Sequence, residues 1–146
     1  MCESIDEKFM RRAIELAKEA ATLDEVPVGA LIVRDGKIIA EAYNTRQSDK
    51  CATHHAEILA IEQACRALGG WRLPECTLYV TMEPCCMCAG AAVNARIPRV
   101  VYGAADIRFG AMGSLIGTSP SQVFASSTKR PKDVTEFITP KKHSPT

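Results

Sequence analysis

The sequence predicts an α/β domain in which helices cover the faces of a mixed central sheet. A chain of 146 residues corresponds to one domain by the usual relation between length and domain number. Residues 28–33 and 37–43 have the pattern of an antiparallel hairpin, whereas residues 77–103 follow a strand–helix–strand order. Such an order gives a parallel pair with a right-handed crossover, so the sheet is mixed and the helices pack on its faces.

The first helix is expected to begin at Ser4. Ser4 and Glu7 form a capping-box signal, in which each side chain satisfies a backbone N–H group of the first turn. Apolar residues then recur at helical spacing, at Phe9, Ala13, Leu16, Ala17 and Ala20. We expect Pro27 to end this helix, because proline cannot continue the hydrogen-bond ladder.

A hairpin and a second helix follow. Arg34-Asp35-Gly36 lies between the β-rich runs 28–33 and 37–43 and is a strong hairpin signal. Residues 56–68 predict a helix that stops at Gly69-Gly70, since glycine readily adopts the conformation that ends a helix.

The last three expected elements surround a group of cysteines. Residues 77–81 form a short apolar strand, residues 85–96 a helix of small residues, and residues 99–103 another strand of the buried type. Pro84 stands near the start of the helix, where its missing N–H group has no cost. After Ile116 the pattern deteriorates.

The C-terminal stretch carries four prolines and many serines and threonines. Only residues 134–138 have the pattern of a regular element there. We therefore divide the chain into a folded domain over residues 1–117 and a loosely ordered C-terminal tail over residues 118–146.

Composition restricts the compartment and the partners. Seven unevenly spaced cysteines without a secretory signal are typical of reduced thiols and metal ligands, not of a disulfide framework. No stretch approaches the roughly 20 apolar residues of a membrane span. The net charge of +1 provides no global attraction for nucleic acid, so any such affinity must come from a local patch. We expect a soluble, cytoplasmic protein without membrane contacts.

Two short motifs predict a metal site. His55 supplies a nitrogen, and Cys85 and Cys88, three residues apart in a helical turn, supply two sulfurs that can face one ion. Zinc prefers a tetrahedron of nitrogen and sulfur ligands, and catalytic zinc sites keep the fourth position for water. Glu57 is then a carboxylate that is not needed as a ligand. The pattern indicates one hydrolytic Zn²⁺ per subunit.

Alternatives remain for the neighbouring residues. Spacing alone does not separate His54 from His55, but the motif leaves one residue before Glu57 and so selects His55. Cys86 is expected to be a packing residue; otherwise it is the fourth ligand of a structural site. Glu57 is expected to move protons beside a zinc-bound hydroxide, unless it is only an acid that favours the helix dipole. Asn44, at the end of a strand, either contacts a base or ribose or is an ordinary turn residue.

The order His-x-Glu…Pro-Cys-x-x-Cys is the signature of zinc nucleobase deaminases. With the segments 26–30, 78–85, 99–104 and 110–115, the chain resembles the bacterial tRNA-specific adenosine deaminases of the cytidine deaminase-like superfamily. The resemblance covers about residues 6 to 116. It implies the cytidine deaminase-like α/β/α layered sandwich with a mixed central sheet.

The resemblance also assigns roles. It implies that His55, Cys85 and Cys88 hold zinc and that Glu57 shuttles protons. It further implies a set of substrate-binding residues: Asn44 at the target nucleoside, Asp106 near its sugar, and Val28 and Ala30 in the base pocket. The implied reaction is the hydrolytic deamination of adenosine to inosine at the wobble position of a tRNA anticodon, in a homodimer that grips the anticodon loop.

The tail diverges from this family. Its members continue after the Ser114-Leu115 segment through an Asn-His pair into an amphipathic C-terminal helix, and neither follows Ile116 here. Two other functions therefore stay open. One is the deamination of a free nucleobase or nucleoside of the guanine or cytosine type. The other is a non-catalytic, zinc-stabilised protein that binds RNA or a partner.

Overall fold

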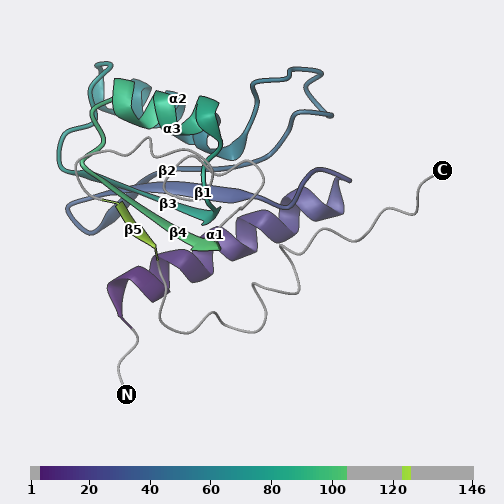
Figure 1. The fold of residues 1–146 in the computed structure, drawn as a ribbon, viewed down its shortest axis with the longest axis horizontal. Helices are drawn as coiled ribbons and strands as arrows, with labels where there is room; N and C mark the ends of the chain where they lie inside the picture. Colours follow the sequence, from purple (N-terminus) through teal and green to yellow (C-terminus); the bar gives the residue numbers. More distant parts are fainter. Residues whose placement is uncertain (1–3, 105–122, 126–146) are drawn as a thin grey trace.

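A mixed five-stranded sheet forms the centre of the protein (Figure 1). The computed structural model describes residues 4–104 and 123–125. Strand β1 (Gly29–Arg34) pairs antiparallel with β2 (Lys37–Tyr43) and with β3 (Cys76–Met82). Strands β4 (Arg99–Ala104) and β5 (Val123–Ala125) then add in parallel, giving the order β2-β1-β3-β4-β5. The predicted mixed sheet is confirmed.

Helices cover both faces of this sheet. Helix α1 (Ile5–Thr22) packs on one face, and α2 (Ala56–Leu68) and α3 (Cys86–Asn94) lie side by side on the other (Figure 1). Each face has its own hydrophobic core, with large side chains under α1 and mainly alanine, valine and isoleucine under α2 and α3. The arrangement is the expected α/β/α layered sandwich.

Local signals in the sequence explain where these elements start and turn. The Ser4 hydroxyl accepts a hydrogen bond from the Glu7 backbone N–H at 3.1 Å, which caps α1. Asp35 and Gly36 both have positive φ, at 52° and 73°, as a two-residue turn between twisted strands requires. Gly69, with φ of 73°, ends α2 at the predicted residue.

Gly29 sets how closely α1 approaches the sheet. A Cβ atom at this position would lie 2.1 Å from the Ala13 carbonyl oxygen and 2.8 Å from the Leu16 Cβ. Only a residue without a side chain allows this contact between α1 and β1.

Several elements differ from the sequence predictions. Helix α1 ends at Thr22, five residues before Pro27, because the chain turns at Asp24 (φ 57°) and the Glu25 N–H bonds back to the Ala20 carbonyl. Cys85 is the N-cap of α3 and not its first residue. The sequence analysis also missed β5, since three residues are too few to show a strand period.

The predicted element at 134–138 lies outside the described residues, and the boundary between 117 and 118 stays a prediction. Among the residues that the structure describes, no helix has the length and apolar character needed to cross a bilayer.

Candidate active site

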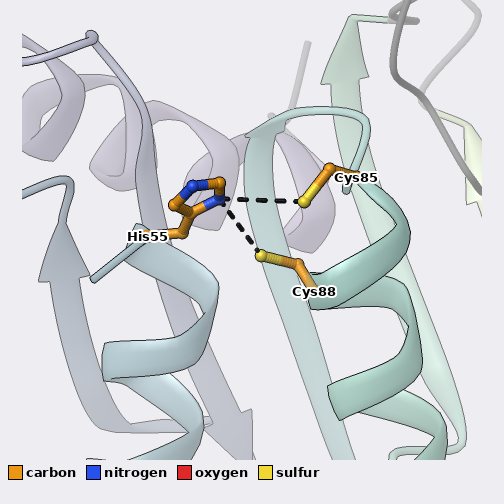
Figure 2. A group of neighbouring side chains, drawn as sticks. All are labelled: His55, Cys85 and Cys88. Atoms are coloured by element: carbon orange, nitrogen blue, oxygen red, sulfur yellow. Dashed lines mark hydrogen bonds between the residues drawn. The ribbon is translucent and has the colours of Figure 1, made fainter. Parts of the chain in front are cut away.

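Three side chains with metal-binding atoms meet where α2 and α3 begin (Figure 2). His55 is the N-cap residue of α2, Cys85 is the N-cap residue of α3, and Cys88 lies in the first turn of α3. The His55 Nδ1 atom lies 3.7 Å from the Cys85 Sγ and 3.5 Å from the Cys88 Sγ. All three ligand atoms lie within 4.8 Å of one another. The fold therefore joins two motifs that are thirty residues apart.

These separations fit a single zinc ion. Zinc–nitrogen and zinc–sulfur bonds of ~2.05 Å and ~2.3 Å at a tetrahedral angle place the nitrogen and sulfur roughly 3.6 Å apart. The two observed nitrogen–sulfur distances, 3.7 Å and 3.5 Å, lie on either side of this value. One nitrogen and two sulfurs are also the donor set that zinc prefers.

The two cysteine thiols differ in acidity. The pKa of the Cys85 thiol is lowered to about 4, chiefly because the Cys88 thiol donates a hydrogen bond to it and also because His55 does. The pKa of Cys88 is raised, chiefly by its hydrogen bond to Cys85 and then by burial. The pair thus gives up its first proton easily and holds the second, which a bound cation would displace.

The His55 imidazole is held between these sulfurs and an acid. Its pKa is raised, chiefly by the hydrogen bond with Cys85 and further by the charge of Glu57. Burial and the positive charge of Arg46 act in the opposite direction. A cation that binds Nδ1 competes with this proton, so metal binding at His55 depends on pH.

Glu57 is a buried acid beside the three ligands. It lies in the first turn of α2, and only 4% of its surface is exposed. Burial raises the pKa of its carboxyl group, while a hydrogen bond with its own backbone opposes this effect. Its Oε1 atom has no hydrogen-bond partner among the described residues. An acid that only favoured a helix dipole would gain nothing from such burial, so Glu57 is the candidate proton carrier.

Asn44 fixes the start of helix α2. This buried residue follows β2, and its Oδ1 atom accepts a hydrogen bond from the Ala56 backbone N–H at 2.9 Å. The bond satisfies one of the N–H groups that every helix start leaves without a partner inside the helix. Because Ala56 lies between His55 and Glu57, Asn44 orients both. It is therefore more than an ordinary turn residue.

The neighbours named in the sequence analysis lie away from the ligand group. The His54 Nδ1 atom is 2.7 Å from the Asp49 carboxylate, so His54 belongs to the preceding loop. Cys86 is exposed, and the prediction that it packs against the core is wrong. Cys86 is the first residue of α3. It is also not part of the cluster of ligand atoms found among the described residues.

The other proposed substrate residues have different positions. Val28 and Ala30 are buried in the core cluster under α2, and Ala30 has no exposed surface. Ala30 pairs with Ala42 and Val80 in the middle of the sheet. Asp106 lies outside the described residues.

The sequence analysis missed Glu25. It is 5% exposed, and its carboxylate accepts hydrogen bonds from the Gln47 and Ser48 backbone N–H groups of the loop before His55. No periodicity links residue 25 to residues 47 and 48. The only sign in the sequence is an acidic pair, Asp24-Glu25, shortly before a strand.

Comparisons with known proteins agree with this site. The profile of the MafB19-like deaminase family matches residues 5–140, which extends beyond the segment 6–116 that carried the resemblance. A tRNA-specific adenosine deaminase of Bacillus subtilis is 49% identical over 119 residues, which are 82% of this chain and 74% of that protein.

Two solved structures have the same fold. One, from studies of A-to-I editing by tRNA:A34 deaminases at the wobble position of transfer RNA, is 44% identical with a TM-score of 0.76. It is matched over 81% of this chain and 96% of its own length. The other, a guanine deaminase from Bacillus subtilis, is 45% identical with a TM-score of 0.66 over 68% of this chain and 64% of its own.

The layered sheet and the histidine–cysteine–cysteine cluster beside a buried glutamate define a deaminase of the cytidine deaminase-like class. The extent of the profile match and the identity to the Bacillus subtilis relative then place the chain more narrowly. It belongs to the MafB19-like deaminase family, in the group of the tRNA-specific adenosine deaminases.

Proposed function

We propose that this protein catalyses the zinc-dependent hydrolytic deamination of adenosine to inosine at the wobble position of a tRNA anticodon. The observation that carries the proposal is the buried Glu57, whose Oε1 atom lacks a partner among the described residues, next to three ligand atoms that fit zinc. The adenosine specificity rests on the likeness to the tRNA-specific relatives.

His55, Cys85 and Cys88 would hold one zinc ion per subunit. When bound there, zinc acts as a Lewis acid and makes a water molecule a strong nucleophile at neutral pH. Zinc is the metal proposed because the donor set and the nitrogen–sulfur separations fit it.

Glu57 moves the protons of the reaction. Its carboxylate takes a proton from the attacking water and passes it to the ring nitrogen next to the reacting carbon of adenine. A carbon–oxygen bond forms in this step. Glu57 then takes the remaining proton from the new hydroxyl group and delivers it to the exocyclic amine, so the carbon–nitrogen bond breaks, ammonia leaves and the hydroxyl oxygen becomes the carbonyl oxygen of inosine. Because burial raises its pKa, the Glu57 carboxyl is a stronger proton acceptor than an exposed carboxylate.

The remaining substrate contacts are also proposals. Asn44 uses its Oδ1 atom for the Ala56 N–H, which leaves its amide nitrogen as the donor for the target nucleoside. Val28, directly before strand β1, and Ala30, within it, would shape the floor of the base pocket, and Asp106 would lie near the ribose. A base in a folded RNA loop must leave its stack to reach such a site.

The partners follow from the same likeness. We infer that the substrate is the anticodon loop of a tRNA and that the enzyme acts as a homodimer in the cytoplasm. The whole chain carries a net charge of only +1, so any electrostatic attraction for RNA must come from a local group of basic residues.

The test is to incubate the zinc-loaded protein with a tRNA that carries adenosine at the wobble position and to assay for inosine there. We expect inosine with the original sequence and none with Glu57→Gln. Protein with one zinc per chain that forms no inosine would contradict the proposal.

A second substrate class has one observation in its favour. The solved guanine deaminase from Bacillus subtilis is as similar in sequence as the tRNA deaminase structure, at 45% and 44% identity. Guanine offered to the same zinc-loaded protein separates the two functions. Ammonia release from guanine without inosine formation in tRNA would favour the free-base reaction.

A further inference from the structure

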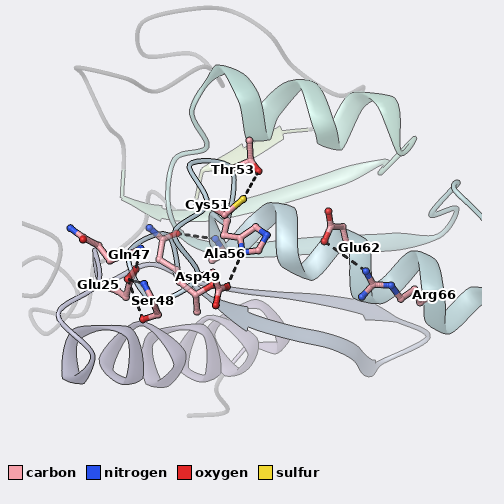
Figure 3. A network of polar contacts seen from close by, with 12 residues as sticks. Glu25, Gln47, Ser48, Asp49, Cys51, Thr53, Ala56, Glu62 and Arg66 are labelled. Carbon is pink, nitrogen blue, oxygen red and sulfur yellow. Dashed lines mark hydrogen bonds and ion pairs between the residues drawn. The ribbon is translucent and has the colours of Figure 1, made fainter.

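A buried carboxylate outside the proposed chemistry holds the loop that leads into His55. Glu25 follows the end of α1, where its own N–H bonds to the Ala20 carbonyl at 3.0 Å. Its side chain accepts hydrogen bonds from the Gln47 N–H at 3.1 Å and the Ser48 N–H at 2.8 Å, and the Ser48 hydroxyl lies 3.4 Å away (Figure 3). Glu25 thus joins the end of α1 to the middle of the loop formed by residues 44–55.

The loop is folded around this anchor. The Asp49 N–H bonds to the Thr45 carbonyl, and the Cys51 N–H bonds to the Arg46 carbonyl, which makes a short helical turn. The first N–H groups of such a turn have no partner inside it. Glu25 accepts hydrogen bonds from two of them, those of Gln47 and Ser48. The Asp49 carboxylate closes the turn through the Thr45 hydroxyl and His54 (Figure 3).

The anchored loop presents positive charge beside the metal-binding residues. Its exposed face forms a shallow, open hollow of about 370 Å³ that is lined by Arg46, Gln47, Lys50, Cys51 and Ala52. Arg46 is close enough for its charge to act on the His55 imidazole. Two cations that line one hollow of a fixed loop leading into His55 suit the phosphate groups on either side of a target nucleotide.

We propose that Glu25 is a positioning residue for RNA: it holds the loop of residues 44–55 so that Arg46 and Lys50 meet the phosphates that flank the target adenosine. This inference rests on the proposed tRNA function. A loop that is fixed before binding loses little conformational freedom when RNA arrives, so Glu25 acts on RNA affinity. It does not touch the reacting atoms and leaves the chemical step unchanged.

The test uses the full-length, zinc-loaded protein with Glu25→Ala and the milder Glu25→Gln. Glutamine keeps the size of the side chain but replaces one of the two accepting oxygens with an amide donor. Amide hydrogen exchange of residues 44–55 and steady-state kinetics on an anticodon stem-loop RNA are measured. In Glu25→Ala we expect exchange at residues 47 and 48 and the KM for RNA to rise about tenfold each. We expect kcat to stay within about twofold, and Glu25→Gln to show the same pattern at smaller size.

Glu41→Gln is the matched control. Glu41 also links α1 to another element, since it accepts hydrogen bonds from Arg12 and lies on β2. Its loss should leave both the exchange of residues 44–55 and the KM unchanged. An unchanged exchange rate in Glu25→Ala would show that Glu25 does not hold the loop. A loosened loop with an unchanged KM, or a fall in kcat alone, would show that the loop does not serve RNA.

A binding measurement separates this inference from the proposed function. Fluorescence anisotropy with the same RNA needs no turnover. If the unaltered protein forms no inosine, a salt-sensitive RNA affinity that weakens about tenfold in Glu25→Ala still supports the role of Glu25. RNA affinity that does not depend on salt would overturn the phosphate contacts whatever the enzyme catalyses.

Discussion

The two faces of the sheet differ in what they contain. Under α1, the core is built from large side chains such as Phe9, Leu31 and Tyr79, and its polar groups are paired at the edge. Under α2 and α3, the core is built mainly from alanines and other small residues, and it contains the buried Glu57 with an oxygen that has no partner among the described residues. On the α1 face, packing and paired polar groups favour the folded state. On the opposite face, burial of the reactive Glu57 carboxyl group reduces stability.

A cluster of polar side chains at the edge of the α1 face, formed by Asp6, Tyr79 and Arg99, shows the difference between the two faces most clearly. The Asp6 carboxylate accepts two hydrogen bonds from the Arg99 guanidinium, at 2.9 Å and 2.6 Å, and one from the Tyr79 hydroxyl at 2.6 Å. Every strong acceptor there has a donor. Substitutions on the two faces should therefore affect different measurements.

Loss of a metal ligand should have the largest effect. Cys85→Ala and Cys88→Ala are expected to lose zinc and all deaminase activity, because two remaining ligands cannot hold a tetrahedral site. Cys86→Ala is the matched control and should keep one zinc per chain, since Cys86 is exposed on the same helix. Metal analysis of the purified proteins measures both. Zinc loss in Cys86→Ala would move that residue into the ligand set.

Glu57→Gln should come next. The amide cannot carry protons, so we expect kcat to fall by about 10³-fold while zinc is retained. The free energy of unfolding should not fall, because the buried carboxyl group has little stabilising role. Parallel measurements of kcat, zinc content and urea unfolding test all three statements. Turnover at the original rate would leave Glu57 without a catalytic function.

On the α1 face, Gly29→Ala should affect stability and not chemistry directly. The added Cβ would lie 2.1 Å from the Ala13 carbonyl oxygen, so α1 must shift away from β1. We expect a loss of about 3 kcal/mol in the free energy of unfolding, measured by urea denaturation. Gly70→Ala serves as a comparison without steric contact, because nothing lies within 4 Å of its Cβ position and its φ is not positive. Equal losses in the two variants would rule out the close approach as the cause.

The smallest effect should come from Asp6 and should depend on pH. The Arg99 hydrogen bonds hold the pKa of Asp6 below its ordinary value of 3.8. The stabilisation is therefore fully present above pH 3.8 and is lost as the pH falls through the lower pKa of the folded state. Urea midpoints of the original protein and Asp6→Asn should differ at neutral pH and converge in acid. A constant difference would place the effect of the substitution outside this titration.

Local patterns accounted for most of the fold. The cap at Ser4, the turn at Asp35-Gly36 and the end of α2 at Gly69 each depend on a few adjacent residues, and the structure has them where the sequence places them. The end of α1 was misplaced because the chain turns at Asp24 before Pro27 has any influence. Strand β5 was missed because its pairing with β4, not its own three residues, makes it a strand.

The site residues that belong to short sequence motifs could be predicted. His55, Cys85 and Cys88 could be chosen because zinc ligands follow fixed spacings, and the fold brings the three together. Glu25 could not be chosen, because its partners at positions 47 and 48 become neighbours only through tertiary structure. The prediction that Cys86 is a packing residue failed, because burial of a small residue near a helix start depends on how that helix lies on the sheet.

The strand order also fixes when the ligand atoms can first meet. His55 follows β2, whereas Cys85 and Cys88 follow β3, and β1 lies between these two strands. A growing polypeptide that has completed only the hairpin has one ligand and no partner for it. The three ligand atoms reach their native arrangement only after β3 has paired with β1 and α3 has formed. If the site holds zinc as proposed, an ion bound in this arrangement would mark a chain whose central strands are already in register.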